Sequence, residues 1–261
     1  MDQNSTTITP TNKSLDRALH LLDIMANKGS SFNIAEIAKL LSINRATAQS
    51  IINSLEQENY VEKDSKTGKY SLGYQMYNLG NMYRHKYPFL LAAEKQIMNY
   101  SKTRTIKINV IVLKPDAIAL IILCKDISII PTLVQGQVLP AYASACGKLL
   151  LSYLKPDELE KILNEVELKA FTYKTITDKK NLKEQLKQFR EKGYAYETDE
   201  LMLNRSCIAA PILNISGEVI AAVSFSATTA EIEQERKILT TEIISLARSI
   251  SIELGYNYLD F

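Results

Sequence analysis

Residues 44–53 gather the side chains that are best suited to recognising another macromolecule. Amide, hydroxyl and guanidinium groups follow one another here, and such groups donate hydrogen bonds to phosphate oxygens and to the edges of bases. A helix built only for protein contact would more often expose apolar or aromatic residues. This stretch therefore predicts contact with double-stranded DNA. The candidate residues, at the start and on the outer side of one helix, are Asn44, Arg45, Ala46, Thr47, Gln49 and Ser50.

Residue types that could support catalysis or bind a metal are sparse. The pair Gly147-Lys148 lacks the upstream glycine and the following Ser or Thr of a phosphate-binding loop. A nucleophilic cysteine needs a nearby base to activate it. The sequence contains no CxxC pair of the kind that binds zinc. We therefore expect no enzyme, no metal and no cofactor. The cysteines and histidines are widely spaced: Cys124, Cys146, Cys207, His20 and His85.

The overall composition excludes several classes of protein. The 261 residues are 46% hydrophobic and 23% charged, as in an ordinary globular protein. The polar segment 1–13 has no apolar core, so it is not a signal peptide and is predicted to be disordered. No apolar run approaches the roughly 18 to 20 residues that span a bilayer. We expect a cytoplasmic protein without a membrane partner.

Net charge alone does not predict a nucleic-acid partner. The net charge is +2; residues 1–87 contain 10 basic and 8 acidic residues, and residues 88–261 contain 21 of each. The excess is small, but it lies entirely in the segment that holds the candidate DNA contacts. Phosphate contacts are local, so a local positive patch is sufficient.

Three short helices are predicted to position the candidate DNA contacts. Ser14 is expected to cap the first helix, which ends at Gly29. Asn33 and Glu36 approximate a capping box for the second helix, and Asn44 caps the third. Apolar residues recur at helical spacing through all three: Leu15, Ala18, Leu19, Leu22, Met25, Ile34, Ile37, Ala38, Leu41, Ala48, Ile51, Ile52 and Leu55.

A β-hairpin is predicted directly after the third helix. Its strands are residues 60–63 and 70–72, joined by a polar turn in which Lys66 and Lys69 are expected to contact backbone phosphate. Two helices joined by a tight turn and followed by a hairpin make a winged helix-turn-helix, predicted here over residues 14–73. Residues 74–87 are expected to form a linker helix, or alternatively a last helix packed on this small domain.

Residues 88–257 are predicted to form a larger α+β domain with a mainly antiparallel sheet, because helices bracket strands and hairpins join the later strands. Helices are expected at residues 88–102, 145–154, 156–165, 179–192 and 231–254. Strands are expected at residues 106–112, 117–123, 128–134, 194–198, 207–213 and 219–226.

Seven short motifs in order resemble those of the IclR family of bacterial transcriptional regulators. They are SLDRAL at 14–19, YSLG at 70–73, ASACGK at 143–148, TITD at 175–178, REKGYA at 190–195, CIAAP at 207–211 and AAVS at 221–224. The resemblance implies a winged helix-turn-helix, a linker helix and a GAF-like effector domain. It also implies homodimers, often paired into tetramers, and a small organic or aromatic acid as effector.

The N-terminus of the helix predicted at 145–154 is a candidate anion site. Ser144 is its expected cap, so the amides of Ala145 and Cys146 lack acceptors within the helix and can bind a carboxylate. Ser224 and Ser226 would share one strand face. Packing alone is the alternative role for Ser226, Cys207 and the Cys146 side chain. The resemblance implies these effector-binding positions: Leu139, Ala145, Cys146, Glu197, Cys207, Ser224 and Ser226.

Some residues depart from the family pattern. Ser42 and Asn59 stand where family members often have glycine, and Glu197 stands where many have aspartate. Ser50 replaces a frequent arginine of the recognition helix. Ser50 is also the best argument for the alternative function, a protein-interaction adaptor with a degenerate DNA-binding half.

Overall fold

The computed structural model describes residues 12–29, 31–104, 106–115, 118–125 and 136–257. The chain divides into two compact units between Lys86 and Tyr87. Within the described ranges, no helix combines the length and apolar character needed to cross a bilayer.

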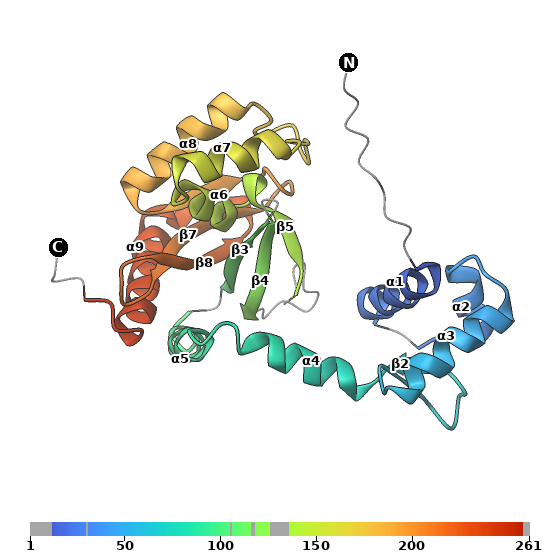
Figure 1. The fold of residues 1–261 in the computed structure, drawn as a ribbon. Helices are drawn as coiled ribbons and strands as arrows, with labels where there is room; N and C mark the ends of the chain where they lie inside the picture. Colours follow the sequence, from blue (N-terminus) through green and yellow to red (C-terminus); the bar gives the residue numbers. More distant parts are fainter. Residues whose placement is uncertain (1–11, 30, 105, 116–117, 126–135, 258–261) are drawn as a thin grey trace, which may run out of the picture. The chain divides into compact units, whose positions relative to one another are not determined.

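The N-terminal unit contains the predicted three helices and hairpin (Figure 1). Its core is formed by apolar side chains of the three helices and of the first hairpin strand, among them Leu21, Met25, Ile37, Ile52 and Val61. The elements are α1 (Lys13–Lys28), α2 (Ile34–Leu40), α3 (Arg45–Gln57), β1 (Val61–Lys63), β2 (Tyr70–Leu72) and α4 (Tyr74–Arg84).

Local capping signals decide where these helices begin and end. The Asn33–Glu36 capping box is present in both directions, and Gly29 ends α1 in the left-handed conformation. The prediction that Ser14 caps α1 is wrong. Asn12 does so instead, because its side chain accepts hydrogen bonds from the amides of Ser14 and Leu15, so the helix begins at Lys13.

The C-terminal unit is an α+β domain, as predicted. Its six-stranded sheet has the order β5-β4-β3-β8-β7-β6, and every neighbouring pair is antiparallel. The strand predicted at residues 128–134 lies outside the described residues. The strands are β3 (Lys107–Lys114), β4 (Ile118–Lys125), β5 (Val138–Pro140), β6 (Ala195–Thr198), β7 (Ser206–Leu213) and β8 (Val219–Ala227). The helices are α5 (Leu90–Tyr100), α6 (Ala145–Ser152), α7 (Pro156–Glu165), α8 (Lys179–Lys192) and α9 (Thr229–Glu253).

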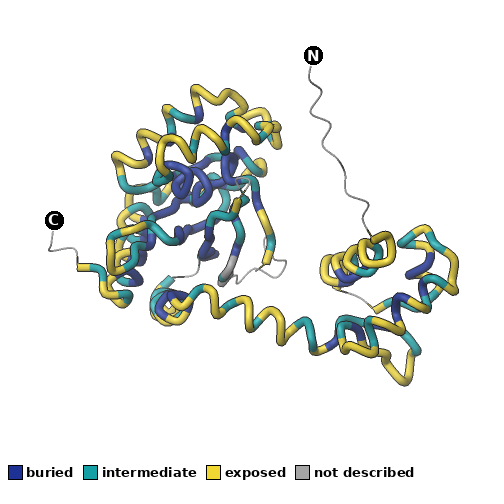
Figure 2. Tube along the Cα trace, viewed as in Figure 1, coloured by how far each residue is buried: buried dark blue, intermediate teal, exposed yellow. Residues whose placement is uncertain are grey.

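Helices cover both faces of this sheet (Figure 1). Helices α5 and α9 pack against one face, where Ile108, Val223 and Phe225 contribute to the core. Helix α6 packs against the other face, where Ala209 and Ala222 lie, and α8 packs on α6. All eight residues of α6 are buried, and Figure 2 shows this helix dark along its length. Polar side chains on either face of the sheet are therefore removed from water.

Candidate functional site

The start of α3 carries the first group of predicted DNA contacts. The Asn44 side chain caps the helix by accepting a hydrogen bond from the Thr47 amide at 2.8 Å. Arg45 and Ala46 are exposed beside it, and Gln49 is half-buried. Capping leaves the remaining first-turn amides and the Arg45 guanidinium available to an anion such as a phosphate.

Thr47 and Ser50 lie on the flank of α3 that faces α1. Together with Leu15 and Ala18 of α1 they line a groove of about 340 Å³. The structure therefore divides the predicted α3 contacts between the helix start and this flank.

The hairpin turn presents the predicted lysines. The Asp64 carboxylate accepts hydrogen bonds from the amides of Lys66 and Thr67, at 2.8 and 2.7 Å, and these bonds lower the pKa of Asp64. The turn is thereby held in one shape, with Lys66 exposed and Lys69 half-buried. Lys66 is the better placed of the two to meet phosphate.

In the C-terminal unit, Ser144 caps α6 as predicted. Ser144 has extended backbone dihedrals, and its hydroxyl accepts a hydrogen bond from the Gly147 amide at 3.2 Å. The amides of Ala145 and Cys146 lie in the first turn, where no carbonyl of the helix can accept from them. A Cβ on Gly147 would lie 2.4 Å from the Ala141 carbonyl oxygen, so only glycine allows this close approach.

The strand register aligns the predicted polar residues beneath α6. Glu197 pairs with Cys207, and Cys207 pairs with Ser226. Directly paired residues of antiparallel strands point to the same face, so these three form one row. Ser224 lies on the same face as Ser226, two residues along β8, and β8 packs against α6. Leu139 of β5 joins the apolar cluster that contains Cys146. The structure thus aligns Glu197, Cys207, Ser224 and Ser226 on the face that α6 covers, with Ala145 and Cys146 in the first turn of that helix. Leu139 lies on β5, at the opposite edge of the sheet from the strand that carries Glu197.

Burial controls the protonation of this site. It raises the pKa of Glu197 to about 7, although the Glu200 amide donates to the Glu197 carboxylate at 3.0 Å and favours the charged form. Burial also raises the pKa of Cys146 to about 12 and that of Cys207 well above its usual value. Both thiols are therefore neutral near pH 7, and they act as weak hydrogen-bonding groups rather than nucleophiles.

A buried ion pair beside the site was not predicted. The Lys148 side chain is fully buried; it pairs with Glu200 and donates a hydrogen bond to Gln185 at 2.7 Å. Burial lowers the pKa of Lys148, and the Glu200 carboxylate opposes that shift. The pair connects α6 to α8 and to the segment after β6, so it fixes α6 over the sheet.

Two further polar residues of the site were missed in strand β3. Lys107 and Asn109 are 5% and 2% exposed, and they pair with Ser226 and Ser224. A strand is predicted at residues 106–112, but the sequence alone gives its polar residues Lys107 and Asn109 no role in the site. Only the pairing of β3 with β8 identifies these residues as part of the site, and no local pattern in the sequence specifies that pairing.

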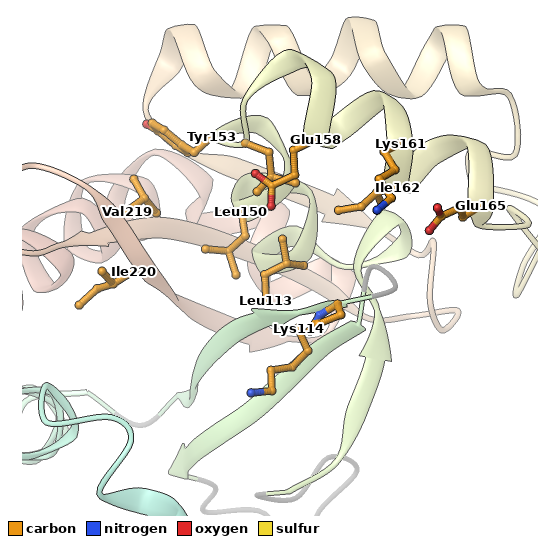
Figure 3. Close-up of a pocket in the computed structure, with 12 residues that line it drawn as sticks. Leu113, Lys114, Leu150, Tyr153, Glu158, Lys161, Ile162, Glu165, Val219 and Ile220 are labelled. Atoms are coloured by element: carbon orange, nitrogen blue, oxygen red, sulfur yellow. The ribbon is translucent and has the colours of Figure 1, made fainter.

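A separate cavity of about 500 Å³ lies at the other end of α6 (Figure 3). Leu113 and Leu150 contribute apolar surface, and Glu158, Lys161 and Glu165 of α7 contribute charge. The residues that line it include none of the seven expected for the effector. This cavity is therefore distinct from the α6 N-terminus.

Comparisons with known proteins match both units. The family described as IclR helix-turn-helix domain matches residues 14–65, and the family described as bacterial transcriptional regulator IclR C-terminal matches residues 85–252. The HTH-type transcriptional regulator BhcR of Paracoccus denitrificans is 29% identical over 245 residues, covering 93% of this chain and 88% of BhcR.

Solved structures show the same architecture. The IclR protein of Thermotoga maritima has 25% identity and a TM-score of 0.80, covering 94% of this chain and 99% of that one. An IclR homologue of Microbacterium hydrocarbonoxydans, solved with 4-hydroxybenzoate, shares the fold with a TM-score of 0.75 at 19% identity, covering 93% and 99%.

These matches extend over the DNA-binding and the effector halves alike, and the relatives are named as regulators. They do not favour a protein-interaction adaptor. The chain belongs to the IclR family of bacterial transcriptional regulators, with an N-terminal IclR helix-turn-helix domain and an IclR C-terminal domain.

Proposed function

We propose that the protein binds double-stranded operator DNA and that a small organic or aromatic acid raises or lowers its affinity for that DNA. The observation that carries the choice of an acid is the N-terminus of α6, where Ser144 leaves the amides of Ala145 and Cys146 without helical acceptors. The helix dipole adds positive potential at the same point. A carboxylate binds such a site without any basic side chain.

The surroundings of these amides support the same class of ligand. Ser224 and Ser226 supply hydroxyls that can donate to carboxylate or carbonyl oxygen. Glu197, with its pKa raised to about 7, is largely protonated below neutral pH and then does not repel an anion. The Microbacterium homologue solved with an aromatic acid supports this assignment.

On the DNA side, we propose that Asn44, Arg45, Ala46, Thr47, Gln49 and Ser50 meet the major groove, with Lys66 and Lys69 on backbone phosphate. Two copies of the chain would place two such helices on a roughly palindromic site. Exposed apolar residues support self-association of this half: Leu15, Leu19, Tyr74, Tyr77, Leu79 and Met82.

We propose functional boundaries at residues 14–73 for DNA binding, 74–87 for the linker and 88–257 for the effector domain. A regulator of bacterial transcription acts where the chromosome is, so we place it in the cytoplasm, and we assign it no enzymatic reaction. The ligand acts because its affinity differs between the conformation that binds DNA and the conformation that does not.

A backbone substitution tests the acid site directly. Ala145→Pro removes one of the two amide donors, and proline is accepted at the first position of a helix. Ser144 already has the extended conformation that precedes proline, with φ −124° and ψ 145°. We expect acids to raise the melting temperature of the wild-type chain and their neutral primary amides not to do so. Ala145→Pro should weaken acid binding about tenfold, the loss of one charge-assisted hydrogen bond.

Lys179→Pro is the matched control, because it makes the same change at the exposed first position of α8. It should leave acid binding unchanged. Equal stabilisation by acids and by their amides, or undiminished acid binding by a folded Ala145→Pro variant, would refute the assignment.

A further inference from the structure

Asn109 of β3 has an unsatisfied hydrogen-bonding atom. Across the described part of the chain, its Oδ1 is the one buried side-chain nitrogen or oxygen without a hydrogen-bond partner. The residue is 2% exposed, so bulk water does not satisfy this atom. Buried polar atoms in native proteins nearly always have a partner, and an unpaired one costs free energy. The structure therefore provides an acceptor that a bound molecule could satisfy.

The strand register places Asn109 in the effector site. Asn109 pairs with Ser224, and directly paired residues share a face of the sheet. Strands β3 and β8 both pack against α6 on this face, where Ile111 and Ala222 share an apolar cluster with Cys146. The unpaired oxygen of Asn109 therefore faces the layer that lies between the sheet and α6, on the same side as the amides proposed to bind a carboxylate.

The chemistry of the two groups is complementary. The α6 amides are donors and require an acceptor from the ligand, whereas a carboxamide oxygen is an acceptor only and requires a donor. A simple monocarboxylate, ionised near pH 7, has no donor to offer. A hydroxy acid offers a carboxylate for the amides and a hydroxyl for Asn109.

We propose that Asn109 is a specificity-determining residue, which selects effectors that carry a hydroxyl group in addition to a carboxylate. This inference rests on the proposed acid site at α6. A site built to bind a ligand hydroxyl discriminates against the analogue that lacks it, because the protein atom is then left buried and unpaired.

Matched pairs of acids test the proposal by isothermal titration calorimetry on the full chain. The pairs are 4-hydroxybenzoate with benzoate, glycolate with acetate, and lactate with propionate. We expect the wild-type chain to bind the hydroxy acid of at least one pair about tenfold more tightly than its partner, the gain expected from one buried hydrogen bond. In Asn109→Leu, which is nearly isosteric, and in Asn109→Ala, that ratio should fall to about one.

Asn164→Leu is the control, because Asn164 is an exposed asparagine on α7. It should keep the wild-type ratio. Asn109→Leu should also raise the melting temperature of the ligand-free chain, since it removes the unpaired atom.

The outcomes separate this inference from the acid site itself. Acids that bind without preference for the hydroxyl, or a preference that persists in both Asn109 variants, would overturn the role of Asn109 and leave the acid site intact. Failure of every acid to bind the wild-type chain would overturn both proposals.

Discussion

Replacing Glu197 by glutamine should change how the stability of the protein depends on pH. Burial raises the pKa of this carboxyl from 4.5 to about 7. The groups that face it are the Glu200 carboxylate, the Lys148 ammonium and the Cys207 thiol; Glu200 raises the pKa and Lys148 lowers it. Desolvation is the largest contribution, so the folded protein favours the neutral form.

The direction in which the unfolding free energy changes with pH follows from the number of protons that the folded and unfolded chains bind. Between pH 4.5 and 7 the folded chain holds a proton that the unfolded chain has lost, so the free energy of unfolding falls as pH rises through this window. Each pKa unit corresponds to about 1.4 kcal/mol, and the shift of Glu197 therefore amounts to about 3 kcal/mol. The loss levels off about one pH unit above the folded pKa, near pH 8. Glutamine cannot ionise, keeps an oxygen that accepts from the Glu200 amide, and avoids this loss.

Urea denaturation from pH 5 to pH 8 measures the effect. The difference in unfolding free energy, Glu197→Gln minus wild type, should increase by about 2 to 3 kcal/mol across this range and level off near pH 8. Glu184→Gln, at an exposed position of α8, should give a constant difference. A constant difference for Glu197→Gln would show that the carboxyl is ionised throughout, and the account of the site's electrostatics would be wrong.

Three further predictions address DNA binding, the effector and packing. Arg45→Ala should weaken operator binding about tenfold and reduce the slope of log affinity against log salt by about 1, as for the loss of one phosphate contact, with acid binding unchanged in calorimetry. Combined Ser224→Ala and Ser226→Ala should abolish the effector response in a gel-shift titration; an unchanged response would remove both hydroxyls from the site. Gly147→Ala should destabilise the protein by about 1 to 3 kcal/mol in thermal or urea unfolding, because its Cβ would overlap Ala141. Gly80→Ala in α4, with no atom within 4 Å of the added Cβ, should instead stabilise by up to about 1 kcal/mol, and equal effects of the two would contradict the packing argument.

Local signals in the sequence were sufficient to predict most helices and their ends. Asn33, Asn44, Ser144 and Asp178 each cap the helix that they were expected to cap, since capping depends on residues three apart. The exception is α1, where two residues could cap: Asn12, two residues before Ser14, is the cap, and the helix begins at Lys13.

Contacts between distant segments could not be predicted in the same way. Lys107 and Asn109 could not be assigned to the site, because nothing in the local sequence indicates which face of β3 lies under α6 or which strand pairs with it. The ion pair of Lys148 with Glu200 joins residues 52 positions apart, and no periodicity marks it. The candidate effector positions were found through the motifs of a family, whereas Asn109 required the register of the sheet.

The burial of the candidate effector site affects how fast an effector can bind and leave. Six of its seven expected residues are less than 9% exposed, and the helix above them is buried along its whole length. A metabolite can enter or leave such a buried site only when the structure around α6 opens locally. Association is therefore slower than free diffusion allows, and dissociation requires the same opening. The effector would therefore bind and leave more slowly than at an open site, and the DNA-binding state would lag behind changes in the metabolite level.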